Sequence, residues 1–167
     1  MRKRLLASAF IVLTLALSHG ATTFAAASRV QTSFTLVDAG SFVFQSQSSA
    51  ALSGDGFEKQ GFGLNRHVGS NGQFDVVPGA DRCANGLTGV LVGSAVESNG
   101  DRINYTINNE LCPTEVPGIF SASGTYKITG GTGKYAAAKG GGLFEGLADF
   151  NPGSLKYKCL LFGTITY

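Results

Sequence analysis

Alternation of apolar and polar residues after an Asn-Gly turn is the feature that most constrains the fold of this chain. Ser98-Asn99-Gly100-Asp101 separates two β-prone runs, at 87–97 and 102–111, and Asn-Gly is the strongest short hairpin signal. A turn centred on Asn99-Gly100 would place Cys112 opposite Leu87. Period-two alternation in the second run predicts a strand with one buried side, whose members are Ile103, Tyr105, Ile107, Asn109 and Leu111.

Strand signals recur along the rest of the chain, whereas sustained helical spacing does not occur in the sequence. Runs at 119–129, 140–150 and 156–167 are β-prone, and Asn151-Pro152-Gly153-Ser154 makes a turn between the last two. The runs 32–37 and 41–47 are β-prone and partly alternating, and weaker runs lie at 59–68 and 73–77. Eight or nine strands, about ten residues apart, predict an all-β sandwich or barrel. Closure into a barrel would also remove exposed sheet edges.

The first residues have the pattern of a secretory signal peptide. Met1-Arg2-Lys3-Arg4 is basic, an apolar run extends from Leu5 to Leu17, and Ala25-Ala26-Ala27 has the form of a cleavage site. The alternative is a membrane anchor, but the run is shorter than the roughly 20 residues that span a bilayer. We therefore expect a signal peptide over residues 1–27, cleavage near Ala27, one domain over 28–167, and a secreted or periplasmic protein.

Removal of the signal peptide changes the charge of the chain. The precursor has 13 Lys and Arg against 11 Asp and Glu, and three of the basic residues but none of the acidic ones lie before residue 28. The mature chain therefore carries one more acidic than basic group. This balance gives no electrostatic footprint for nucleic acid or for an anionic membrane surface, so we expect neither as a partner.

Three cysteines lie in the mature chain, and an exported protein meets an oxidising compartment. Cys83 and Cys112 lie at the same end of the predicted hairpin, so we predict a disulfide between them. Cys159 is then left over, and its neighbours Tyr157, Leu160 and Leu161 indicate a buried strand residue. A small apolar core side chain is the favoured interpretation of Cys159, with a nucleophile as the alternative.

Residues 124–146 hold eight glycines, which raises the question of a phosphate-binding loop. The pattern Gly-x-x-x-x-Gly-Lys-Ser/Thr fails, because Ile128 stands at the first glycine position and Tyr135 at the hydroxyl position. A dinucleotide pattern beginning at Gly131 fails as well, since no helix or βαβ unit follows. A structural role is favoured, in which glycines let the chain leave one strand and bend into the next. The residues concerned are Gly130, Gly131, Gly133 and Gly140.

The segment 124–140, Gly-Thr-Tyr-Lys-Ile-Thr-Gly-Gly-Thr-Gly-Lys-Tyr-Ala-Ala-Ala-Lys-Gly, resembles the signature of allene oxide cyclase-like and dirigent-like proteins. The resemblance implies a closed antiparallel eight-stranded β-barrel with an apolar central cavity, often in a trimer, so a homo-oligomer, trimer or dimer, is an expectation here. Plant members cyclise an unsaturated fatty-acid epoxide or steer phenoxy-radical coupling. Dirigent-like sequences often have arginine before the last glycine of the motif, where this chain has Lys139, and lysine lacks the planar fork of arginine.

Few residues in the sequence point to chemistry. His67 is the only histidine after residue 27 and no Cys-x-x-Cys occurs, so we expect no metal site and no cofactor. Lys139 and Glu145 are the candidates for a catalytic charge if they face the interior, although the outward orientation is favoured for the face of Glu145. Tyr105 and Tyr126 are expected to point inward, first as core residues and second as ligand-binding residues.

These features support three hypotheses about function. The first is an exported small barrel that binds a small hydrophobic molecule in an apolar cavity. The second is an isomerase, cyclase or dirigent-type enzyme that acts by confining a reactive substrate. The third is a structural extracellular protein without a ligand.

Overall fold

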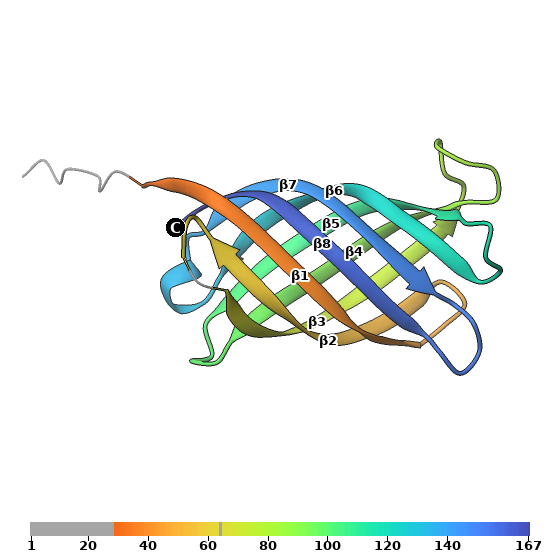
Figure 1. Cartoon of the computed structure of the whole chain (residues 1–167), viewed down its shortest axis with the longest axis horizontal. Coiled ribbons are helices and arrows are strands. Elements are labelled where there is room, and N and C mark those ends of the chain that lie inside the picture. The colour runs from red at the N-terminus through yellow and green to blue at the C-terminus, as the bar shows by residue number, and fades with distance from the viewer. Residues whose placement is uncertain (1–28, 64) are drawn as a thin grey trace, which may run out of the picture.

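The described residues form eight antiparallel strands and one short helix. The structure is a computed structural model that describes residues 29–63 and 65–167; the predicted signal peptide lies outside the described residues. The elements are β1 (Gln31–Phe44), β2 (Ser49–Gln60), β3 (Arg66–Pro78), β4 (Leu87–Glu97), β5 (Arg102–Pro113), β6 (Ile119–Gly131), the 3₁₀-helix η1 (Gly133–Tyr135), β7 (Lys139–Asp149) and β8 (Lys156–Thr166). Figure 1 shows the strands tilted around a common axis.

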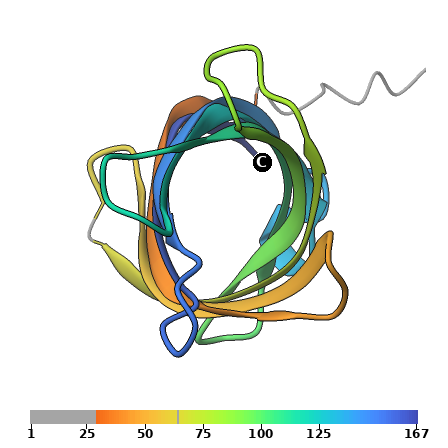
Figure 2. The same cartoon turned by 90° about the vertical axis from the view of Figure 1, so that its right-hand side faces the viewer.

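The strands form a closed barrel in sequence order. Each strand pairs with the next along the chain, and the ladder between β1 and β8, from Gln31↔Thr166 to Ser41↔Lys156, closes the ring. Figure 2 looks along the barrel at the end where β1–β2, β3–β4, β5–β6 and β7–β8 are joined, which we call the cavity end. The opposite end carries η1 and is called the η1 end. The expected closed antiparallel eight-stranded barrel is thus confirmed.

The first three strands differ from the sequence expectation. The run 32–37 and the first four residues of the run 41–47 belong to one strand, β1, which pairs through Asp38, Ala39 and Gly40 with both β2 and β8. The sequence analysis left residues 38–40 outside both runs, and Asp and Gly are indeed depleted in strands. The strand β2 (Ser49–Gln60) was not expected at all, and the predicted run 59–68 contains the turn between β2 and β3. Backbone pairing on both sides overrides weak local preference here.

The hairpin of β4 and β5 has a register one residue away from the expected one. Leu87 faces Leu111 rather than Cys112. The connection is a three-residue loop rather than a two-residue turn, since the N–H of Glu97 donates to the carbonyl of Asp101 over 2.9 Å. Gly100 takes the positive φ of 90° that such a loop needs. The alternation itself is confirmed, because Ile103, Tyr105, Ile107, Asn109 and Leu111 are all buried.

The predicted disulfide is confirmed. Cys83, in the connection between β3 and β4, bonds Cys112 at the end of β5, with Cα atoms 5.8 Å apart. The bond ties the long β3–β4 connection to the barrel at the cavity end. It supports folding in an oxidising compartment.

The glycine-rich connection between β6 and β7 inserts a tyrosine into the η1 end. The register of β5 and β6 shifts between Asn104 and Tyr105, a β-bulge that bends β6 as it leaves the sheet. Gly133 begins η1 with φ of 54°, and a Cβ there would collide with the carboxylate of Asp101. The turn delivers Tyr135 into the interior with no exposed surface. The structural interpretation of these glycines fits this geometry.

The interior differs between the two halves of the barrel. Toward the η1 end, apolar side chains pack with almost no exposed surface, among them Phe34, Leu36, Val68, Ile103, Ile128 and Ile165. Toward the cavity end, the inward side chains are a mixture of phenylalanines, leucines and small residues, and they leave a cavity. Within residues 29–63 and 65–167, no helix is long and apolar enough to cross a membrane.

Candidate functional site

A cavity of about 60 Å³ occupies the barrel interior toward the cavity end and is partly open to solvent. A single water needs roughly 10–15 Å³, so the enclosed space has room for only a few water-sized groups. A larger molecule would extend through the open end. The walls are mainly apolar and come from every strand. Phe42, Phe74, Leu91, Leu111, Phe144 and Phe150 are representative lining residues.

A carboxylate stands in this apolar cavity. Asp38 points inward from the middle of β1 and is 3% exposed. The hydroxyl of Ser70 on β3 donates to its Oδ2 over 2.7 Å, and the hydroxyl of Tyr157 on β8 donates to the same oxygen over 3.0 Å. The two hydroxyls are 3.1 Å apart. Three strands, β1, β3 and β8, thus hold one polar cluster against the cavity.

The hydrogen bonds leave part of this cluster unused. Oδ1 of Asp38 is buried and has no hydrogen-bond partner among the described residues. Oδ1 of Asn109, which also lines the cavity, is in the same condition. Buried polar atoms are nearly always paired, and an unpaired one costs about 1–3 kcal/mol. Both atoms are acceptors, so a hydrogen-bond donor would complete them.

The neighbours of Asp38 are held neutral. Burial, together with the negative charge of Asp38, raises the pKa of the Cys159 thiol to about 12. Burial and the same carboxylate also raise the pKa of Tyr105 and of Tyr157. Tyr105, Tyr157 and Cys159 all line the cavity, so Asp38 is surrounded by protonated, uncharged groups at neutral pH.

The residues singled out from the sequence are distributed differently. Tyr105 lines the cavity beside Asp38, whereas Tyr126 lies in the packed core, its ring centroid 6.0 Å from that of Phe34. Lys139 and Glu145 are exposed on β7, because they alternate with the inward residues of that strand. Neither supplies a charge to the cavity, and the interior carboxylate is Asp38 instead. Cys159 is partly buried and free.

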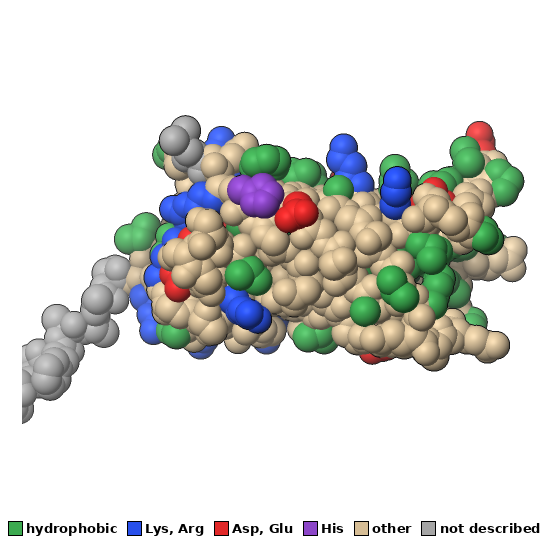
Figure 3. All heavy atoms as spheres, turned by 90° about the horizontal axis from the view of Figure 1, so that it is seen from below, with side chains coloured by type: hydrophobic (Ala, Val, Ile, Leu, Met, Phe, Trp, Pro, Cys, Tyr) green, Lys and Arg blue, Asp and Glu red, His purple; other side chains and the backbone are tan. Residues whose placement is uncertain are grey.

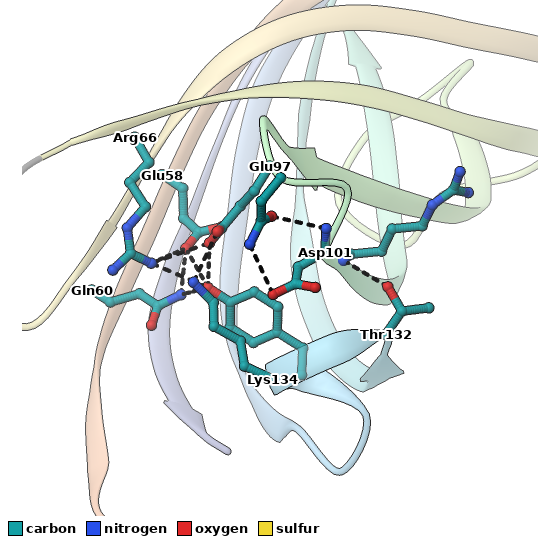
Figure 4. A network of polar contacts seen from close by, with 10 residues as sticks. Glu58, Gln60, Arg66, Glu97, Asp101, Thr132 and Lys134 are labelled. Carbon is teal, nitrogen blue, oxygen red and sulfur yellow. Dashed lines mark hydrogen bonds and ion pairs between the residues drawn. The ribbon is translucent and has the colours of Figure 1, made fainter.

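A second polar cluster closes the η1 end, as Figure 4 shows. The hydroxyl of Tyr135 donates to Oε1 of Glu97 over 2.5 Å and lies 3.3 Å from Oε1 of Glu58. The same hydroxyl accepts from Nε2 of Gln60 over 2.8 Å and from Nη1 of Arg66 over 3.2 Å. A buried phenol therefore links β2, β3 and β4 to η1.

The η1-end cluster has two acidic and two basic side chains, and the acidic ones are more deeply buried than the basic ones. Arg66 lies 3.1 Å from Glu97 and 3.7 Å from Glu58, and Lys134 lies 2.8 Å from Glu97. Burial raises the pKa of Glu58. Burial acts in the same direction on Glu97, but hydrogen bonds from Lys134 and Tyr135 and the charge of Arg66 outweigh it and lower the Glu97 pKa. The cluster is a structural plug, because each member bonds another member rather than facing the cavity.

Sequence reasoning missed Asp38, Ser70, Glu58 and Glu97. A usable signal exists for two of them. Asp38 is an even number of residues from Phe34, Leu36 and Phe42, so it lies on the same face of its strand as they do. Glu97 lies on the same face as Ala95 for the same reason. An acidic residue at an inward position of an alternating strand indicates an interior charge. Asp38 lay between the two predicted runs, 32–37 and 41–47, so its place in the alternation was not considered.

Metal ligation has no support in the geometry of the described chain, where no group of three or more His, Cys, Asp and Glu side chains converges on one point. His67 is well exposed and lies 3.8 Å from Asp55 on the outer face of the barrel.

Comparison with known proteins adds little. No protein-family model and no curated protein matches this chain. Among solved structures, the pterocarpan synthase dirigent protein GePTS1 is similar over 96% of this chain and 99% of its own, with 15% sequence identity and a TM-score of 0.45. The likeness is remote, and we draw no argument about function from it.

Proposed function

We propose that the barrel binds a small molecule that has an apolar body and a hydrogen-bond donor at one end. The observation that carries this proposal is Asp38, a buried carboxylate with an unpaired oxygen in a cavity with apolar walls. A bound donor would complete the hydrogen bonding of Oδ1, while the rest of the ligand would lie against the phenylalanines near the open end.

The energetics of the cavity favour such a ligand. Each methylene group removed from water contributes about 0.8 kcal/mol, and a hydrogen bond to a charged group contributes about 1.5–3 kcal/mol. A ligand with six buried carbons and one donor would thus gain roughly 6–8 kcal/mol before the cost of immobilisation. Immobilisation costs at least about 4 kcal/mol, so a ligand of this size should bind with a Kd of about 1 mM or weaker, and each further buried methylene tightens binding by about fourfold.

Fluorescence titration with N-phenyl-1-naphthylamine, an apolar probe with one N–H donor, tests the proposal. We expect saturable enhancement in the wild type. Ala122 lines the cavity, so Ala122→Leu should fill it and weaken probe binding by at least about tenfold, since two to three displaced methylene-sized groups cost 1.4 kcal/mol or more. Val90→Leu, on the exposed outer face of β4, is the control and should bind as the wild type does. Equal binding by Ala122→Leu would refute binding in the cavity.

An enzyme that acts by confinement is the second candidate, and Asp38 is the observation that favours it. A carboxylate held by two hydroxyls inside a cavity is a group that accepts a proton from a bound molecule. Small molecules extracted with the protein from its native secretions would be incubated with wild type and with Asp38→Asn. Conversion by the wild type but not by Asp38→Asn supports an enzyme. If the molecules stay unchanged in both samples, the confinement enzyme is rejected and the binding function stands.

Export and self-association also belong to this proposal. The Cys83–Cys112 disulfide supports an oxidising destination. Exposed apolar side chains on the outer surface of the barrel, including Phe57, Leu143 and Leu147, support a homo-oligomer. Sedimentation equilibrium of the mature protein checks the second point: a mass of one chain at all concentrations contradicts it.

A further inference from the structure

Resting on the proposed function, we propose that the cavity selects ligands that carry a protonated amine and rejects carboxylates. The inference concerns the charge of the ligand head group, which the apolar walls do not determine. It rests on the isolation of Asp38 and on the distribution of charge along the barrel.

Asp38 is a buried anion without a cation. Within residues 29–63 and 65–167, the ion pairs involve Glu58, Glu97 and Asp55, and none involves Asp38. Its two hydrogen-bond donors, Ser70 and Tyr157, are neutral hydroxyls on the same oxygen. A buried charge is normally paired. An ammonium group has three donors and a positive charge, so it would supply both the missing cation and the donor for Oδ1.

Other charges in the cavity do not compensate for Asp38. Tyr105 and Cys159 lie close enough for its carboxylate to raise their pKa values, after the larger effect of burial, and in their neutral forms they add no charge. Lys158 borders the cavity, but its side chain is exposed on the outer face of β8. A carboxylate ligand would therefore meet a like charge with no cation between them, which is unfavourable.

The barrel has opposite charge at its two ends. In the half of each strand nearer the cavity end, and in the adjoining connections, there are three basic residues, Arg82, Lys156 and Lys158. Seven of the eleven acidic residues of the described chain lie in the same half. Figure 3 shows Lys and Arg side chains gathered at the η1 end instead. An excess of acid around an opening attracts cations and repels anions, so approach and final binding favour the same sign.

Calorimetric titration with three ligands of matched length, hexylamine, hexanol and hexanoate, at pH 7 tests the inference on the wild-type protein. We expect hexylamine to bind on the order of 10- to 100-fold tighter than hexanoate, because its hydrogen bond to Asp38 is charge-assisted. Hexanol, a neutral donor, should lie between them. The series needs no variant, so it stays informative whatever a substitution does to folding.

Asp38→Asn keeps the size of the side chain and removes the charge. It should reduce the ratio of amine to carboxylate affinity to within about threefold, since a neutral amide can accept from an ammonium or donate to a carboxylate and has no charge that favours either. Asp75→Asn is the matched control: Asp75 is exposed on β3 at the cavity end, and its loss should leave most of the ratio intact. Thermal unfolding of each variant confirms that it is folded.

The outcomes separate the two proposals. A preference for hexylamine that Asp38→Asn abolishes and Asp75→Asn retains supports the inference. Equal affinity for all three ligands, or a ratio that Asp38→Asn leaves unchanged, overturns charge selection but leaves binding in the cavity standing. Failure of all three ligands and of N-phenyl-1-naphthylamine to bind overturns the proposed function as well.

Discussion

Substitution of Tyr135 by phenylalanine should destabilise the barrel, although it removes only one oxygen atom. The side chain is fully buried, and its hydroxyl joins Glu97, Gln60 and Arg66 in the η1-end cluster. The ring of phenylalanine can keep the position of the tyrosine ring, so apolar packing is preserved. The loss is therefore one of hydrogen bonding.

The magnitude follows from the partners of the hydroxyl. Its bond to the Glu97 carboxylate spans 2.5 Å, and hydrogen bonds to charged groups contribute roughly 1.5–3 kcal/mol. Arg66 and Lys134 still neutralise Glu97 in the variant, which keeps the loss within that range. A free energy of unfolding lowered by about 1.5–3 kcal/mol corresponds to a Tm lower by roughly 4–12 °C for a domain of this size.

Urea unfolding followed by circular dichroism measures this difference, with the disulfide kept intact. Tyr167→Phe is the matched control. Tyr167 packs its ring edge-on against Tyr135 with centroids 5.0 Å apart, is 42% exposed, and has no hydrogen bond within the part of the chain that the structure describes. Its substitution should change the free energy of unfolding by less than about 0.5 kcal/mol.

A Tyr135→Phe variant as stable as the Tyr167→Phe control would refute the reasoning. It would mean that the buried cluster contributes nothing net to stability and that the η1 end is closed by apolar packing alone.

Three further predictions concern titratable groups. Glu97 has a lowered folded pKa, so its stabilising contribution is present above its ordinary value of 4.5 and is lost as pH falls through the folded pKa; the stability difference between wild type and Glu97→Gln should shrink in acid unfolding curves. Glu58 has a raised pKa, so its contribution is present below 4.5 and is lost as pH rises through the folded pKa, and Glu58→Gln should flatten that loss. Cys159, with a pKa of about 12, should resist iodoacetamide at pH 8 in the folded protein and react in urea. Mass spectrometry follows the alkylation, and rapid modification of the folded protein would contradict the burial of the thiol.

The sequence predicted the barrel better than it predicted the contents of the barrel. Alternation in β5 is strong because its inward residues are nearly all apolar, and the turns after β4 and β7 have Asn-Gly and Pro-Gly signals. Pairing of Cys83 with Cys112 followed from their place at one end of a hairpin. These features depend on neighbouring residues and short distances, which a sequence shows directly.

The strands that carry the candidate site were the ones hardest to predict. Asp38 and Gly40 in β1, and Gly54 and Gly56 in β2, are residues that disfavour isolated strands. In the closed barrel Gly56 faces Asp38 across the ladder, and a Cβ on Gly56 would collide with the backbone of β1. The composition that weakens the strand signal is thus the composition that lets β1 and β2 curve tightly around the carboxylate.

The polar clusters could not be inferred from spacing. Asp38, Ser70 and Tyr157 come from β1, β3 and β8, and the separation of Asp38 from Tyr157 is 119 residues. Barrel closure brings them together, since β1 pairs directly with β8. Glu58, Glu97 and Tyr135 likewise meet only because three connections converge at one end. Alternation along a strand shows that a side chain points inward. Its height along the barrel axis, which decides the side chains it meets on other strands, depends on the register of all eight strands.

The central claim is that a ligand binds inside the barrel at the cavity end, and intermolecular nuclear Overhauser effects test it most directly. Protein labelled with ¹³C in leucine methyl groups would be saturated with N-phenyl-1-naphthylamine. We predict contacts from the probe to Leu91, Leu111 and Leu161, which line the cavity, and none to Leu143 on the outer face of β7, which is 50% exposed. Contacts to Leu143 without contacts to the interior leucines would contradict the account.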